Sequence, residues 1–181
     1  MEAFLALLRE SATMPTAAQI AERAGYSVRS IFERFPDLNA LRVATVDYSL
    51  AQAAALAPPR HVDGDRQTRI RSQVETRAGT CERGVSLWRV FLFTVDESKE
   101  LKVRLSVARQ RTIDRFEIMY RPELATLGEP ERKYLLIALE ALTDMESWAR
   151  MREMYGMSFE ESCAVWVRAI DRMLPLAQPG K

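Results

Sequence analysis

Residues 16–35 read TAAQIAERAGYSVRSIFERF, and this stretch predicts two short helices joined by a tight turn. Thr16 and Gln19 have the spacing of a capping box, in which each side chain accepts a hydrogen bond from the other residue's backbone amide. Gly25 tolerates a positive φ where the first helix must end, and Ser27 can cap the second helix two positions later. The stretch therefore predicts a helix-turn-helix.

The apolar positions of this stretch indicate which faces are buried. The residues expected on the inner faces are Ala17, Ile20, Ala21 and Ala24 in the first helix and Ile31, Phe32 and Phe35 in the second. The outward positions of the second helix are left to Val28, Arg29, Ser30, Glu33 and Arg34. The second helix of a helix-turn-helix enters the major groove, so these side chains are placed to meet DNA.

The chain resembles the TetR family of transcriptional repressors. The positions that match the family's pattern are Thr16, Ile20, Ala21, Ala24, Gly25, Ser27, Ile31 and Phe35. Residues 146–161 also look like the end of the family's eighth helix, a loop and the start of its ninth. The resemblance implies a homodimeric transcriptional regulator that a small-molecule effector releases from double-stranded DNA. Because a homodimer has two-fold symmetry, we expect a palindromic operator.

The resemblance and the docking geometry together assign the DNA contacts. The candidate residues are Thr16, Ser27, Val28, Arg29, Ser30, Phe32 and Arg34. Arg29 is the candidate for base reading, because a guanidinium can pair with both guanine acceptors, which is worth about 1–3 kcal/mol of discrimination. Phe32 stands where the family usually has a tyrosine and Leu38 where a lysine is common, so two phosphate donors are missing. Arg34 can restore one of them.

The charge of the amino-terminal region favours an alternative. The whole chain has a net charge of +1, but residues 1–57 hold five arginines against six acidic residues, a net charge of −1. Affinity for nucleic acid usually rests on a concentrated basic face. The alternative is a homodimeric helical ligand-binding or interaction protein of the same fold that has lost strong operator binding.

Helical periodicity continues along the rest of the chain and predicts an all-α fold of about nine helices. Residues 1–57 are expected to form the DNA-binding domain with its connecting helix, and residues 64–177 the ligand-binding and dimerisation domain. A segment with two prolines and a glycine, residues 57–65, separates them. Later helices are expected at residues 66–80, 84–96, 101–119, 131–155 and 158–174. The apolar content of residues 84–96 predicts a central, buried helix.

Two further sites are predicted in the second domain. The walls of the effector pocket are assigned to Trp88, Phe91, Arg115 and Met119, and Arg115 is expected either in solvent or beside an acidic group such as Asp96 or Glu140 or an anionic ligand. In the resembled family the last two helices form the dimer interface. Their broad apolar faces need cover, and the interface is assigned to Met145, Trp148, Trp166 and Ile170.

The sequence favours neither catalysis nor a membrane. We find no paired carboxylates, no nucleophile with a base and no metal-ligand spacing, and His61 is the only histidine. We therefore expect no enzyme activity, no cofactor and no metal. Cys81 and Cys163 are far apart, which predicts free thiols. No apolar run approaches the roughly 18–20 residues of a membrane helix, so a cytoplasmic protein is expected.

Overall fold

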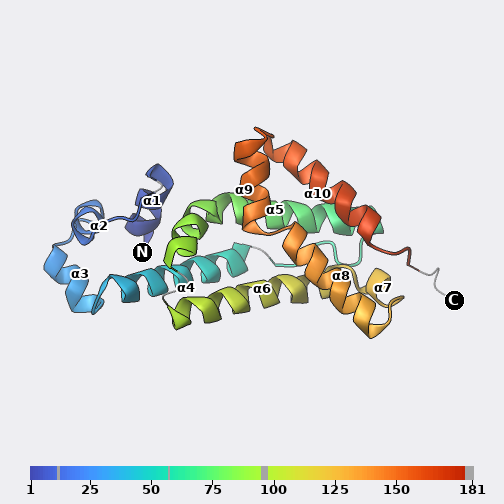
Figure 1. Cartoon of the computed structure of the whole chain (residues 1–181), viewed down its shortest axis with the longest axis horizontal. Helices are drawn as coiled ribbons and strands as arrows, with labels where there is room; N and C mark the ends of the chain where they lie inside the picture. Colours follow the sequence, from blue (N-terminus) through green and yellow to red (C-terminus); the bar gives the residue numbers. More distant parts are fainter. Residues whose placement is uncertain (12, 57, 95–97, 178–181) are drawn as a thin grey trace. The chain divides into compact units, whose positions relative to one another are not determined.

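The structure, a computed structural model, describes residues 1–11, 13–56, 58–94 and 98–177, with the backbone alone at residues 90–94. All regular elements within these ranges are helical (Figure 1). They are α1 (Glu2–Glu10), α2 (Ala17–Ala24), α3 (Val28–Arg34), α4 (Leu38–Leu56), α5 (Arg66–Thr94), α6 (Lys99–Met119), α7 (Arg121–Leu124), α8 (Glu129–Leu142), α9 (Met145–Ala149), the π-helical turn η2 (Arg150–Met154) and α10 (Phe159–Met173). The predicted all-α class with about nine helices is confirmed for this part of the chain.

The helices are divided between two compact units. One consists of Met1–Leu56 and Gly84–Val107, and the other of residues 57–83 and the chain from Ala108 onward. Helices α5 and α6 therefore each contribute residues to both units. The assignment of DNA binding to residues 1–57 and of ligand binding to residues 64–177 concerns function, and it stays a prediction.

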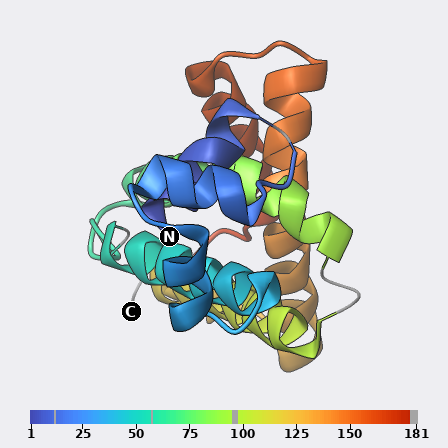
Figure 2. The same ribbon diagram turned by 90° about the vertical axis from the view of Figure 1, so that its left-hand side faces the viewer.

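The core of the first unit joins α1, α2, α3 and α4, whose ribbons are coloured blue to cyan in Figure 2. Its buried side chains are Phe4, Leu8, Ile20, Ala21, Ile31 and Leu41. A second small cluster, formed around Val46 of α4 and Leu101 of α6, includes the partly buried Leu87 and Trp88 of α5. Because α4 takes part in both clusters, it connects the helix-turn-helix to the first turns of α6.

The core of the second unit is larger and is centred on two tryptophans. Trp148 and Trp166 pack with their ring centroids 5.0 Å apart, and Phe159 meets Trp148 edge-on at 5.3 Å. The other fully buried large side chains of this core are Ile70, Phe116, Met119, Tyr120, Leu124, Leu139 and Ile170. The unit thus buries the apolar faces of its last helices within a single copy of the chain.

One predicted helix boundary is wrong: residues 66–94 form a single helix, α5, and residues 95 and 96 of the second predicted helix lie outside the described residues. Gly84 lies at the expected break, inside α5. A glycine inside a helix costs only roughly 0.5–1 kcal/mol relative to alanine, and the packing of the neighbouring residues outweighs this cost. Cys81 there is fully buried and the Glu82 carboxylate accepts a hydrogen bond from Trp148. The segment is also less buried than predicted, since Val85, Leu87 and Trp88 are only partly buried. Its remaining apolar side chains lie outside the described residues.

A second predicted boundary is also wrong: the helix expected over residues 131–155 breaks after Leu142. Thr143 leaves the helical conformation with φ −106° and ψ 24°, and its carbonyl accepts a hydrogen bond of 2.8 Å from Arg77 Nε. Asp144 then caps α9 by accepting from the amide of Ser147 at 2.7 Å. The contact with Arg77 and the new cap together replace the helical hydrogen bonds that the break removes.

Candidate functional site

The predicted turn chemistry of the helix-turn-helix is present in the structure. Oγ1 of Thr16 accepts from the Gln19 amide at 3.3 Å, and Oε1 of Gln19 accepts from the Thr16 amide at 2.9 Å. Gly25 follows α2 with φ 72°, and the Ser27 hydroxyl accepts from the Ser30 amide at 3.1 Å. Local hydrogen bonds thus fix the ends of both helices, while Ile20 and Ile31 anchor them in the core.

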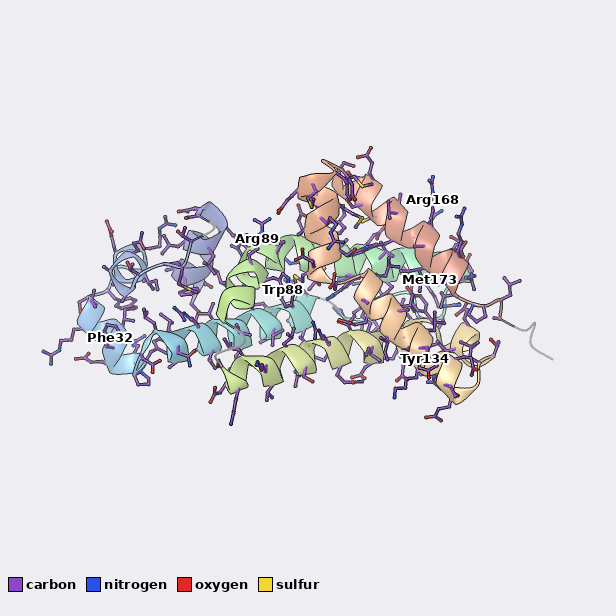
Figure 3. All side chains as sticks on the ribbon, in the orientation of Figure 1. Phe32, Trp88, Arg89, Tyr134, Arg168 and Met173 are labelled. Atoms are coloured by element: carbon purple, nitrogen blue, oxygen red, sulfur yellow. The ribbon has the colours of Figure 1, made fainter. Side chains whose placement is uncertain are left out.

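The outward face of α3 carries most of the predicted DNA contacts. Thr16, Ser27, Val28, Arg29, Phe32 and Arg34 are exposed and Ser30 is partly buried. The expectation that Phe32 anchors α3 inward is wrong, because 44% of its surface is exposed, whereas Ile31 is buried and Phe35 partly so (Figure 3). Positions 31 and 35 lie one turn apart and fill the core, so Phe32 next to Ile31 turns outward.

Two arginines of this region are paired with carboxylates. Nε of Arg29 donates to Glu33 Oε1 at 2.9 Å, one helical turn along α3. Arg23 forms two bonds to Glu10, at 2.7 Å and 2.5 Å, which join α2 to α1. An exposed pair one turn apart is worth only about 0.3–0.5 kcal/mol. Opening the Arg29 pair therefore costs less than the discrimination that a bidentate guanine contact provides.

Tyr26 is a residue of this surface that the sequence analysis did not identify. It lies in the turn between α2 and α3 with 56% of its surface exposed. The guanidinium carbon of Arg34 lies 5.5 Å from the centre of its ring, a cation–π arrangement. This contact restricts the position of the Arg34 side chain at the end of α3. The two side chains therefore lie side by side on the same exposed surface. The sequence signal that could have identified Tyr26 is its position: an aromatic residue in a short turn between two helices cannot reach the core and is therefore exposed.

Polar contacts join α4 to α1 and α6 in the first unit. Oδ1 of Asp37 accepts from the Ala40 amide at 2.7 Å and so caps α4. Tyr48 donates its hydroxyl proton to Glu2 of α1 at 2.7 Å. Arg104 of α6 donates from Nε and Nη2 to the two carboxylate oxygens of Asp47, at 2.6 Å and 2.7 Å. Such a fork fixes orientation as well as distance.

The four residues predicted to wall an effector pocket have different surroundings. Trp88 packs in the first unit beside Val46 and Leu101, whereas Met119 is fully buried in the core of the second unit. Arg115 is partly buried, and its Nε donates to Gln73 Oε1 and its Nη2 to the Pro58 carbonyl at 3.3 Å. Burial lowers the pKa of Arg115. The side chain of Phe91 lies outside the described residues.

A buried polar cluster that the sequence analysis missed lies beside Met119 in the second unit. Arg69, only 7% exposed, donates to the carboxylate of Glu123, to the Met119 carbonyl at 2.8 Å and to the Gly64 carbonyl at 2.7 Å. The hydroxyl of Tyr120 and Oε2 of Glu123 are buried without a hydrogen-bond partner among the described residues. Burial raises the pKa of Tyr120 well above its ordinary value. The hydroxyl therefore stays protonated in the folded protein.

The four residues predicted for a dimer interface are mostly internal. Trp148, Trp166 and Ile170 are at most 1% exposed, and Met145 is partly buried against the same core. These side chains do not need a second copy to cover them. An exposed apolar stripe with helical spacing lies on α8, where Figure 3 labels Tyr134. Its residues are Tyr134, Ile137, Ala138 and Ala141.

Comparisons of the chain with protein families, curated proteins and solved structures give no match. Among the described residues, no helix combines the length and apolar character that crossing a membrane requires. The same residues hold no group of three or more His, Cys, Asp or Glu side chains placed to bind a metal ion. Cys81 and Cys163 are free thiols.

Proposed function

We propose that this protein is a ligand-responsive transcriptional regulator that binds a palindromic operator as a homodimer. The observation that carries the proposal is the α2–α3 unit, in which a capping box, a left-handed glycine and a serine cap join two short helices over a common core. This frame turns Val28, Arg29, Phe32 and Arg34 outward from the second helix. In a helix-turn-helix these are the positions that meet DNA.

The exposed stripe on α8 supports a homodimer. Tyr134 is 68% exposed and Ile137 49% exposed, and Ala138 and Ala141 continue the same face. A continuous apolar helix face in water favours association, and a two-fold axis lets the stripe of one copy pack on that of the other. A symmetric pair of recognition helices about 34–36 Å apart would then read two half-sites.

The contacts of α4 support a route for the effector's influence. Because Arg104 holds Asp47 in a fork, and Leu101 packs on Val46, a displacement of the first turns of α6 moves α4 with it. The hydrogen bond from Tyr48 of α4 to Glu2 would then move α1 together with α4. An effector that binds one arrangement of these helices more tightly would change DNA affinity, with a usual coupling of about 1–3 kcal/mol.

The test is selection of duplexes from a random-sequence DNA library by the full chain, followed by titrations at several salt concentrations. We expect a palindromic sequence to be enriched. Arg34→Ala should weaken the binding of selected and random duplexes alike and reduce the salt slope by about one phosphate contact. Arg29→Ala should mainly reduce the preference for the selected sequence. Absence of enrichment at low salt would contradict the proposal.

The alternative function, a ligand-binding or interaction protein that has lost strong operator binding, is favoured by two observations. Arg23 and Arg29 are both paired with carboxylates, and residues 1–57 have a net charge of −1. Phosphate binding releases counterions in proportion to the contacts made. A dimer whose DNA affinity is weak and almost independent of salt would therefore favour the alternative.

A further inference from the structure

The recognition helix α3 exposes apolar side chains on the face that the proposed function turns toward DNA. Val28 is 39% exposed and Phe32 44% exposed, although Ile31 beside them is buried. Val28 and Phe32 are four residues apart, so their side chains lie on one face of the helix, one above the other. The first turns of α3 therefore present a short apolar stripe.

The charges beside this stripe neutralise each other. Arg29 and Glu33 have the same four-residue spacing and form an ion pair of 2.9 Å. A surface built to grip phosphates would instead concentrate unpaired positive charge. This part of α3 is thus suited to base edges, whereas Arg34 on its Tyr26 platform is the better candidate for a phosphate.

The major groove offers one apolar group for such a stripe, the C5 methyl group of thymine. We propose that Val28 and Phe32 recognise thymine methyl groups, so that the half-site facing α3 contains thymines. This inference rests on the proposed function. Four residues of α-helix rise about 6 Å, which matches about two base-pair steps of roughly 3.4 Å each. The two thymines should therefore lie one or two steps apart.

The experiment uses the full chain and the duplex enriched by selection. Each thymine of the half-site is replaced in turn by deoxyuridine, which removes only the methyl group. At two nearby positions the affinity should fall about fourfold, the expected effect of burying one methyl-sized group. In Phe32→Ala one of these positions should lose its sensitivity to the replacement, and in Val28→Ala the other.

The matched control is Val103→Ala, because Val103 is an even more exposed valine of the same unit, at 61%, on α6. It should leave both sensitivities unchanged. If no thymine replacement alters the affinity of the native chain, or if both variants keep the native sensitivities, the inference is wrong and DNA binding still stands. If no duplex is enriched and none is bound at low salt, the proposed function fails and the inference fails with it.

Discussion

Glu123 is a buried acidic residue of the second unit whose charge needs a partner. Its carboxylate is only 1% exposed and accepts a hydrogen bond from Arg69. Removing one partner of a buried ion pair leaves the other charge without compensation. We expect Glu123→Ala to lower the free energy of unfolding by about 3–5 kcal/mol, measured by urea denaturation.

The double variant Arg69→Met with Glu123→Leu is the control for that prediction. It removes both charges and keeps apolar volume, but it also takes the Arg69 hydrogen bonds away from the Met119 and Gly64 carbonyls, so it should recover only part of the stability that Glu123→Ala loses. A single variant as stable as the native chain would show that the pair contributes no measurable stability.

Glu82 makes the stability of the second unit dependent on pH. Partial burial acts to raise its pKa, but hydrogen bonds from Arg152 and Trp148 outweigh this effect and hold the pKa below its ordinary value of 4.5. A lowered pKa in the folded state contributes stability above pH 4.5, and this contribution is lost as the pH falls through the folded-state value.

We therefore expect Glu82→Gln to lower the Tm at pH 7 and to have little effect once the pH is well below 4.5. Thermal unfolding followed by circular dichroism across this range is the measurement. Glu160→Gln, at an exposed position of α10, should change the Tm little at either pH. If the Tm difference between Glu82→Gln and the native chain were as large in acid as at pH 7, the ionised Glu82 carboxylate would not be the source of the pH dependence.

At the scale of helices, the ends fixed by local chemistry could be predicted and those fixed by distant residues could not. Thr16, Gly25 and Ser158 act on residues within one turn, and the structure has each helix end where the sequence indicates. The break after Leu142 involves the Asp144 cap, which is local, and also Arg77, which is 66 positions away in the sequence. No local pattern at Thr143 signals that contact.

The same distinction holds for the candidate site. The turn and the outward positions of Val28, Arg29 and Arg34 followed from spacing, whereas Phe32 was expected inward and is exposed. The cation–π contact of Arg34 with Tyr26 depends on how the turn folds. Trp148 and Trp166 were correctly identified as needing cover. A sequence does not tell whether a second copy or the chain itself provides it, and here their rings cover one another.

The two left-handed glycines give a test of helix termination. Gly25 has φ 72° and Gly156 has φ 62°, and a Cβ atom at either position would meet nothing within 4 Å. Substitution by alanine is therefore opposed only by backbone strain, roughly 1–2 kcal/mol. We expect Gly25→Ala and Gly156→Ala to lose about this amount in urea denaturation.

Asparagine tolerates the left-handed region better than alanine. Gly25→Asn should therefore be more stable than Gly25→Ala although its side chain is larger. If Gly25→Ala were the more stable of the two variants, side-chain size rather than backbone conformation would determine stability at this turn.

At the scale of the whole molecule, we expect self-association through α8. Ile137→Glu places a charge at the centre of the exposed apolar stripe and should give a folded monomer in sedimentation velocity experiments, because Ile137 is 49% exposed. Trp166→Glu should instead unfold the second unit, since Trp166 is fully buried in its own protomer. Val103→Glu, which is equally charged but lies on α6, should leave the oligomeric state unchanged. A native chain that sediments as a monomer would end this expectation.

Arg66 at the start of α5 forms hydrogen bonds with the carboxyl-terminal end of α10 and the residues that follow it. Its guanidinium donates to the carbonyls of Asp171, Leu174 and Pro175 and to the Asp171 carboxylate, across a sequence separation of 105 residues or more. Closing so long a loop costs chain entropy before any contact compensates for it. This contact should therefore form after the rate-limiting step of folding, and Arg66→Met should accelerate unfolding while leaving the refolding rate almost unchanged.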